Sequence, residues 1–205
     1  SSSEAGTITY GGSCSSSTTS ATTDNNTITL ISLSDGTYSN CTITVTDSAG
    51  NISNSLTITL FTVAIPPTIA EVTAVTTPTN DSTPDYTFSS SEAGTITYGG
   101  SCSSSTTSAT TDNNTITLVS LSEGTYSNCT ITITDNSSND VTLNMSSFTL
   151  DTTTPTIAEV TEVETPTSNS TPDYTFSSSE AGTITYGGSC SSSTTSATTD
   201  NNTIT

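Results

Sequence analysis

The 205-residue sequence contains no lysine, arginine or histidine, against 19 aspartate and glutamate residues. Binding to nucleic acid depends on cationic side chains that neutralise phosphates, so this composition excludes a nucleic-acid partner. A polybasic attachment to a membrane surface is excluded for the same reason. No apolar run approaches the length needed to cross a bilayer, so we expect no membrane-spanning segment. Because side chains cannot form salt bridges with one another, each carboxylate must be hydrated, hydrogen-bonded or bound to metal.

One phrase, SSSEAGTITYGGSCSSSTTSATTDNNTIT, occurs three times, beginning at Ser1, Ser89 and Ser177. The period is 88 residues (89 − 1 and 177 − 89), with no insertion or deletion. A fixed period is typical of a tandem array, and this one has the length of a small domain. The sequence therefore predicts a series of repeated domains.

Proline-bearing linkers predict where one repeat ends and the next begins. Residues 67–154 would be a complete repeat, residues 1–66 the C-terminal part of one repeat, and residues 155–205 the N-terminal part of the next. We favour the interpretation that the chain is a window on a longer array. The alternative is that incomplete parts complete each other between chains by strand donation. Residues 177–205 repeat residues 1–29, so a simple donation would leave surplus strands.

Apolar residues alternate with threonine throughout the complete repeat, which is the pattern of half-buried strands. The alternation predicts strands within residues 68–75, 85–90, 94–100, 113–121, 129–135 and 141–150. In the last of these the phase shifts, which suggests a bulge near Ser146 and Ser147. Residues 120–128 are expected to be a turn, and no segment has a helical pattern. Six or seven short antiparallel strands predict an all-β chain of tandem immunoglobulin-like β-sandwich domains.

Cysteines lie 27 residues apart in each repeat, which predicts the disulfides Cys14–Cys41 and Cys102–Cys129. Cys190 would pair with a residue outside the chain. The absence of CxxC motifs and histidine makes metal binding by the thiols a weaker alternative. Disulfides indicate an oxidising, extracellular or cell-surface location. The acidic-Gly-x-Tyr run before Cys129 resembles the tyrosine corner of immunoglobulin-like domains, in which the tyrosine stands two residues before the cysteine. Tyr126 stands three residues before Cys129, so the two side chains are expected on opposite faces unless a bulge intervenes.

The segments TPDYTF, EAGTITYGG, DGTYSN and DTTTPT resemble the bacterial immunoglobulin-like (Big-type) tandem repeats of large surface proteins and adhesins. The resemblance extends over the whole chain. It implies an extracellular stalk or filament, often with Ca²⁺ between domains, and it does not identify a ligand.

Catalysis is not expected. Histidine and lysine, common general bases, are missing, and a serine nucleophile would lack an activating partner. Paired carboxylates can hydrolyse glycosides. The candidates, Asp81, Asp85, Glu92 and Glu123, recur in or near the other copies, which favours a structural role.

Calcium is the one metal cofactor that the acidic residues suggest, because hard cations prefer carboxylate and carbonyl oxygens. Asp151 and Glu159 flank the second predicted junction, and turns hold the remaining candidates, Asp47, Asp135 and Asp140. The alternative is that all five are solvated loop residues. Val63 replaces Asp151 at the first junction, and no segment matches a spaced DxDxDG loop.

Covalent glycans are the other modification that the sequence suggests. Ten Asn-x-Ser/Thr triplets occur, although many arise by chance in a chain so rich in serine and threonine. Their asparagines are Asn25, Asn40, Asn51, Asn80, Asn113, Asn128, Asn136, Asn144, Asn169 and Asn201. Alternatively, threonine and serine merely cover the exposed sheet faces.

These patterns predict a structural function: an extracellular stalk, spacer or filament at a microbial surface, glycosylated and stabilised by disulfides. The alternative is an adhesin module that binds glycans or another surface, with junctions stiffened by Ca²⁺. The expected partners are neighbouring repeats of the same chain and copies of the chain in a fibre.

Overall fold

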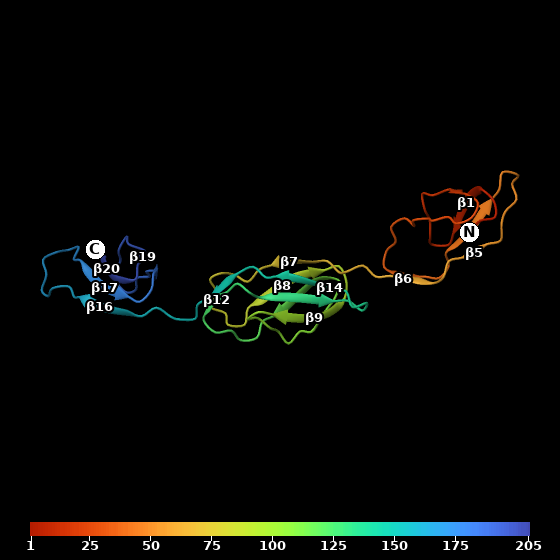
Figure 1. Ribbon diagram of the computed structural model, residues 1–205. Coiled ribbons are helices and arrows are strands. Elements are labelled where there is room, and N and C mark those ends of the chain that lie inside the picture. Colours follow the sequence, from red (N-terminus) through yellow and green to blue (C-terminus); the bar gives the residue numbers. More distant parts are fainter.

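The computed structural model describes all 205 residues, and its twenty strands occur without any helix. Figure 1 shows the strands gathered in three separate bodies along an extended chain. We call these bodies the N-terminal segment (residues 1–66), the central segment (67–154) and the C-terminal segment (155–205). Strands pair antiparallel within each segment, and no pair crosses from one segment to the next. The fold is therefore all-β, built from several small antiparallel sheets. No helix in it could span a membrane.

The central segment contains nine strands. One sheet has the order β10-β9-β13-β14, a second has the order β11-β8-β7, and β12 pairs with β15. The bounds are β7 (Ile69–Thr73), β8 (Asp85–Ser90), β9 (Gly94–Gly99), β10 (Ser108–Ala109), β11 (Asp112–Thr117), β12 (Gly124–Tyr126), β13 (Thr130–Thr134), β14 (Asp140–Asn144) and β15 (Phe148–Leu150).

Alternation along these strands builds one core between the sheets. Tyr86 and Phe88 of β8 are at most 1% exposed and belong to the same buried cluster as Ile131 and Ile133 of β13. The threonines between the apolar residues point outward, and Thr132 shares a hydroxyl hydrogen bond of 2.7 Å with its cross-strand neighbour on β14. β-branched residues suit both faces of such a strand. This two-layer arrangement is consistent with a β-sandwich.

The outer segments contain shorter sheets. In the N-terminal segment β2-β1-β4-β5 form one sheet and β3-β6 another. In the C-terminal segment the sheets are β16-β17-β20 and β18-β19. The bounds are β1 (Gly6–Gly11), β2 (Ser20–Ala21), β3 (Gly36–Tyr38), β4 (Thr42–Thr46), β5 (Leu56–Thr57), β6 (Phe61–Val63), β16 (Ile157–Thr161), β17 (Tyr174–Ser178), β18 (Gly182–Thr183), β19 (Ser196–Ala197) and β20 (Asp200–Ile204).

Two features of the central segment differ from the sequence-based expectation. The phase shift near Ser146 is not a bulge in one strand, because β14 pairs with β13 and β15 pairs with β12. The chain crosses between sheets at this point, so the apolar face must change. The expected turn at residues 120–128 also contains strand β12, which the Gly-Thr-Tyr sequence forms by pairing with β15.

Candidate functional site

The disulfides join the pairs that the 27-residue spacing predicts. Cys14 is bonded to Cys41 and Cys102 to Cys129, and all four side chains are at most 4% exposed. Cys190 is a free, exposed thiol. Disulfides persist in oxidising compartments, so the two bonds indicate a location outside the reducing cytoplasm.

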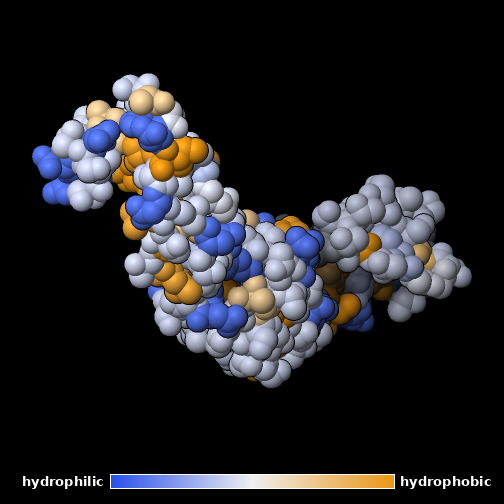
Figure 2. Space-filling view, turned by 90° about the vertical axis from the view of Figure 1, so that its right-hand side faces the viewer, coloured by the Kyte–Doolittle hydropathy of each residue, from blue (hydrophilic) through white to orange (hydrophobic).

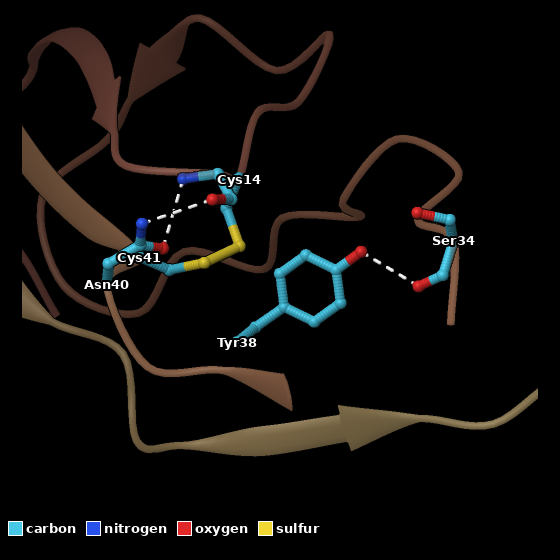
Figure 3. The surroundings of a disulfide bond; sticks show 6 residues. Cys14, Ser34, Tyr38, Asn40 and Cys41 are labelled. Atoms are coloured by element: carbon cyan, nitrogen blue, oxygen red, sulfur yellow. Dashed lines mark hydrogen bonds between the residues drawn. A yellow bond between two sulfur atoms is a disulfide. The ribbon is translucent and has the colours of Figure 1, made fainter. Parts of the chain in front are cut away.

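Asparagine side chains hold the turns beside each disulfide. In Figure 3 the amide of Asn40 reaches back toward the turn before Cys14. Its Oδ1 accepts a hydrogen bond from the Ser13 backbone N–H at 3.2 Å, and its Nδ2 donates to Ser13 Oγ at 3.1 Å. Asn128 accepts from the Ser101 N–H in the same way at 3.2 Å. These contacts fix the two chain ends that each disulfide joins.

A tyrosine completes this arrangement, as Figure 3 shows for Tyr38. Its hydroxyl donates to the Ser34 carbonyl at 2.8 Å, and the Tyr126 hydroxyl donates to the Ser122 carbonyl at 2.6 Å. Each ring also stacks on a phenylalanine of the neighbouring strand, with centroids 5.3 Å and 5.2 Å apart. A hydroxyl bonded to the backbone a few residues upstream is the contact of a tyrosine corner.

Glu71 accepts more hydrogen bonds from residues distant in the sequence than any other carboxylate. Its Oε2 accepts from the Tyr86 hydroxyl and the Ser146 N–H, both at 2.9 Å, and its Oε1 accepts from Ser146 Oγ at 2.7 Å. Partial burial raises the pKa of Glu71, but the bonds from Ser146 and Tyr86 outweigh burial and leave the pKa below 4.5, the ordinary value. Burial, followed by the interaction with Glu71, raises the pKa of Tyr86. No sequence pattern predicts the link between Glu71 and Ser146, which lie 75 positions apart.

The structure does not gather the five calcium candidates into one group. No group of three or more Asp, Glu, Cys or His side chains is arranged to hold a metal ion. The side chain of Asn51 and the backbone of its own turn lower the pKa of Asp47, and Asn139 does the same for Asp135. Asp151 accepts from the Thr153 N–H at 3.2 Å. Asp140 begins strand β14, and Glu159 lies on β16. Burial, followed by the interaction with Glu159, raises the pKa of Tyr174.

Three of the four carboxylates considered for glycoside hydrolysis accept hydrogen bonds from threonines. Asp81 accepts hydrogen bonds from Thr83 in its own turn, and Asp85 accepts from the Thr117 hydroxyl at 2.6 Å. Glu123 accepts from Thr153. Glu92 alone meets a second carboxyl group, that of Asp35. Asp35 belongs to the N-terminal segment and Glu92 to the central segment, so this pair lies at a junction.

All ten asparagines of the glycosylation triplets are exposed. Four of them use their side chains in hydrogen bonds: Asn40, Asn51, Asn128 and Asn169. The side chains of the other six make no hydrogen bond: Asn25, Asn80, Asn113, Asn136, Asn144 and Asn201. These six are the more accessible positions for a covalent sugar.

No family model matches the sequence, and no curated protein is significantly similar to it. A function for this chain therefore rests on the geometry described above.

Proposed function

We propose that the chain is part of an extracellular structural protein, in which immunoglobulin-like repeats of 88 residues form a stalk, spacer or filament at a microbial surface. The observation that carries this proposal is the separation of the strands into three bodies joined end to end (Figure 1). Each body pairs its strands only within itself, so the array can lengthen by addition of units. In such arrays stability is roughly a sum of unit and junction contributions.

The disulfides and the tyrosine contacts support an immunoglobulin-like repeat. Each repeat has a small core, and small cores often need covalent support. The disulfide and the Tyr-to-carbonyl hydrogen bond recur 88 residues apart, at Cys14–Cys41 with Tyr38 and at Cys102–Cys129 with Tyr126. The same features stabilise repeats that must withstand an extracellular environment.

The surface suits a spacer that carries covalent sugars. Most of the face in Figure 2 has the pale colour of residues with intermediate hydropathy, such as serine and threonine, interrupted by separate blue and orange areas. Glycans on the six free asparagines would solubilise such a surface. The mass of the native protein tests this part: a mass equal to that of the bare polypeptide contradicts it, and added hexose masses mapped to those asparagines support it.

Imaging of the native material tests the main proposal. We expect regularly spaced bodies on an extended strand, or a fibre with the same axial repeat. Isolated globules, or one large body around a cleft, would contradict a stalk or filament.

A further inference from the structure

An acidic side chain holds the linker where it leaves each of the first two segments. Asp35 Oδ1 accepts a hydrogen bond from the Ile65 backbone N–H at 2.5 Å. Glu123 Oε2 accepts one from the Thr153 hydroxyl, also at 2.5 Å. Glu123 lies 88 residues after Asp35, and Thr153 lies 88 residues after Ile65, so the two contacts occupy the same positions in the repeat.

A serine holds the same linker where it enters the following segment. Ser91 Oγ accepts from the Thr68 N–H at 2.8 Å, and the Ser91 N–H donates to the Thr68 carbonyl at 2.9 Å. Ser179 makes the same two bonds with Thr156, both at 2.9 Å. The four hydrogen-bonding groups of each Ser–Thr pair are therefore reciprocally satisfied.

Only two residues remain free between these contacts at each junction: Pro66 and Pro67 at the first, Thr154 and Pro155 at the second. We propose that each junction is a two-residue joint, clamped by an acidic side chain on one side and by a serine on the other, and that the first joint is the stiffer. The clamps let small units hold a direction relative to each other without a large interface.

The joints differ in stiffness for two reasons: the number of prolines in each joint, and the contact between the segments beside it. The proline ring locks φ, so both free residues of the first joint are restrained but only one of the second. Pro67 is also buried, whereas Pro155 is exposed. A cavity of about 410 Å³ beside the first joint is lined from both segments, by Thr62 and Val63 on one side and by Ala93 and Asn136 on the other. At the second joint every residue from Asp151 to Glu162 is exposed.

¹⁵N relaxation of the full chain tests the joints, because it reports the rotational correlation time of each segment separately. In the unaltered chain we expect the N-terminal and central segments to share one correlation time. Asp35→Ala should shorten the correlation time of the N-terminal segment, and Glu123→Ala that of the C-terminal segment. Glu4→Ala is the matched control, since it removes the same charge from an exposed side chain without a hydrogen bond. Unchanged amide shifts within each segment show that the variants remain folded.

Three results would overturn the proposal: independent tumbling of the first two segments in the unaltered chain, an Asp35→Ala variant that behaves like Glu4→Ala, or a second joint as stiff as the first. Two glycines inserted between Pro66 and Pro67 give the reference for a free joint. The inference bears on the proposed stalk, but the two can fail separately. Flexible joints leave a beaded strand in images, whereas isolated globules in images leave the relaxation result standing.

Discussion

Cys102 and Cys129 stabilise the central segment by limiting its unfolded chain rather than by adding many contacts. Their bond closes a loop of 27 residues, for which the chain-entropy model gives about 3.5 kcal/mol. The core that this bond supports contains 13 buried residues, so the covalent contribution is a large part of the stability of the segment.

Replacing both Cys102 and Cys129 by serine should therefore lower the free energy of unfolding of the central segment by about 3.5 kcal/mol. Hydrogen exchange of the β13 amides measures this change within the full chain. Cys190→Ser is the control, because that thiol is free and exposed. Equal protection in the two variants would show that the loop constraint contributes nothing.

Gly124 begins β12 with φ at +145°, a conformation that L-residues rarely adopt. A Cβ there would meet no other atom, so the cost of Gly124→Ala is backbone strain alone. We expect a loss of about 1–3 kcal/mol in the stability of the central segment. Gly187→Ala is matched to it, since Gly187 is equally uncrowded but has no positive φ. Similar thermal midpoints for both variants would contradict the strain argument.

For individual residues, the sequence predicts contacts that are covalent or that join positions close together in the chain. The spacing of the cysteines was sufficient to pair them, and Tyr126 was recognised from the acidic-Gly-x-Tyr run before a strand, although it stands three residues before Cys129 instead of two. The contact between Glu71 and Ser146 was not predictable, because neither residue carries a motif and the fold alone brings them together.

The crossing from β14 to β15 is the element on which the two layers of the central segment depend. Met145 is buried at the crossing, and the next residue, Ser146, donates two hydrogen bonds to Glu71 at the start of the other sheet. A strand that changes sheets exposes backbone groups at the corner, and unsatisfied groups there would be costly. The Glu71 carboxylate therefore acts as the acceptor that the corner requires.

This acceptor makes the central segment sensitive to acid. Because folding lowers the pKa of Glu71, its contribution is fully present above the ordinary value of 4.5 and is lost as the pH falls through the lower folded value. We expect the thermal midpoint of the central segment to drop below about pH 4.5. Glu71→Gln should lower the midpoint at neutral pH and remove much of this dependence. Glu164→Gln, at an exposed loop position, controls for the change in net charge, and an identical pH profile for the two variants would contradict the role of Glu71.

Alternation of apolar residues and threonine predicts most strands of this segment because it reports which face is buried. It does not report which strands pair. The two-residue strand β10 has no alternation to detect, and β12 looks like a turn from its glycine. The phase shift at Ser146 was visible, but a bulge and a crossing give the same pattern until the partners β12 and β13 are known.

Across the whole molecule, the repeat period predicts how many bodies to expect, and the proline-bearing segments predict where the linkers lie. The clamps on those linkers were beyond sequence reasoning, since Glu123 was considered only as a turn residue and a catalytic candidate, and no pattern singled out Asp35. The lack of cationic side chains explains why Asp35 and Glu123 take this role. With no salt bridges available, carboxylates are satisfied by backbone amides and hydroxyls, and a linker amide such as that of Ile65 is one such donor.

The first joint also brings together three carboxyl groups, those of Asp35, Glu92 and Asp135, and the chain has no cationic side chain to balance them. The hydrogen bond with Asp35, then burial, and then the charges of Asp35 and Asp135 raise the pKa of Glu92 above 4.5, its ordinary value. Contact between the segments therefore favours the protonated form of Glu92. Protonation of Glu92 therefore stabilises the contact between the two segments fully below pH 4.5, and this stabilisation is lost as the pH rises through the raised pKa of Glu92.

We expect the rotational correlation times of the N-terminal and central segments to be coupled most strongly at acid pH in a titration from about pH 3 to 7. Glu92→Gln keeps an amide donor opposite Asp35 at every pH, so it should make the coupling independent of pH. Glu180→Gln is the matched control, because Glu180 is the counterpart of Glu92 at the second joint. There Glu123, the counterpart of Asp35, is hydrogen-bonded to Thr153. A titration in chelator excludes any effect of divalent ions. If Glu92→Gln keeps the pH dependence of the unaltered chain, the joint responds to the overall loss of negative charge and not to the Asp35–Glu92 pair.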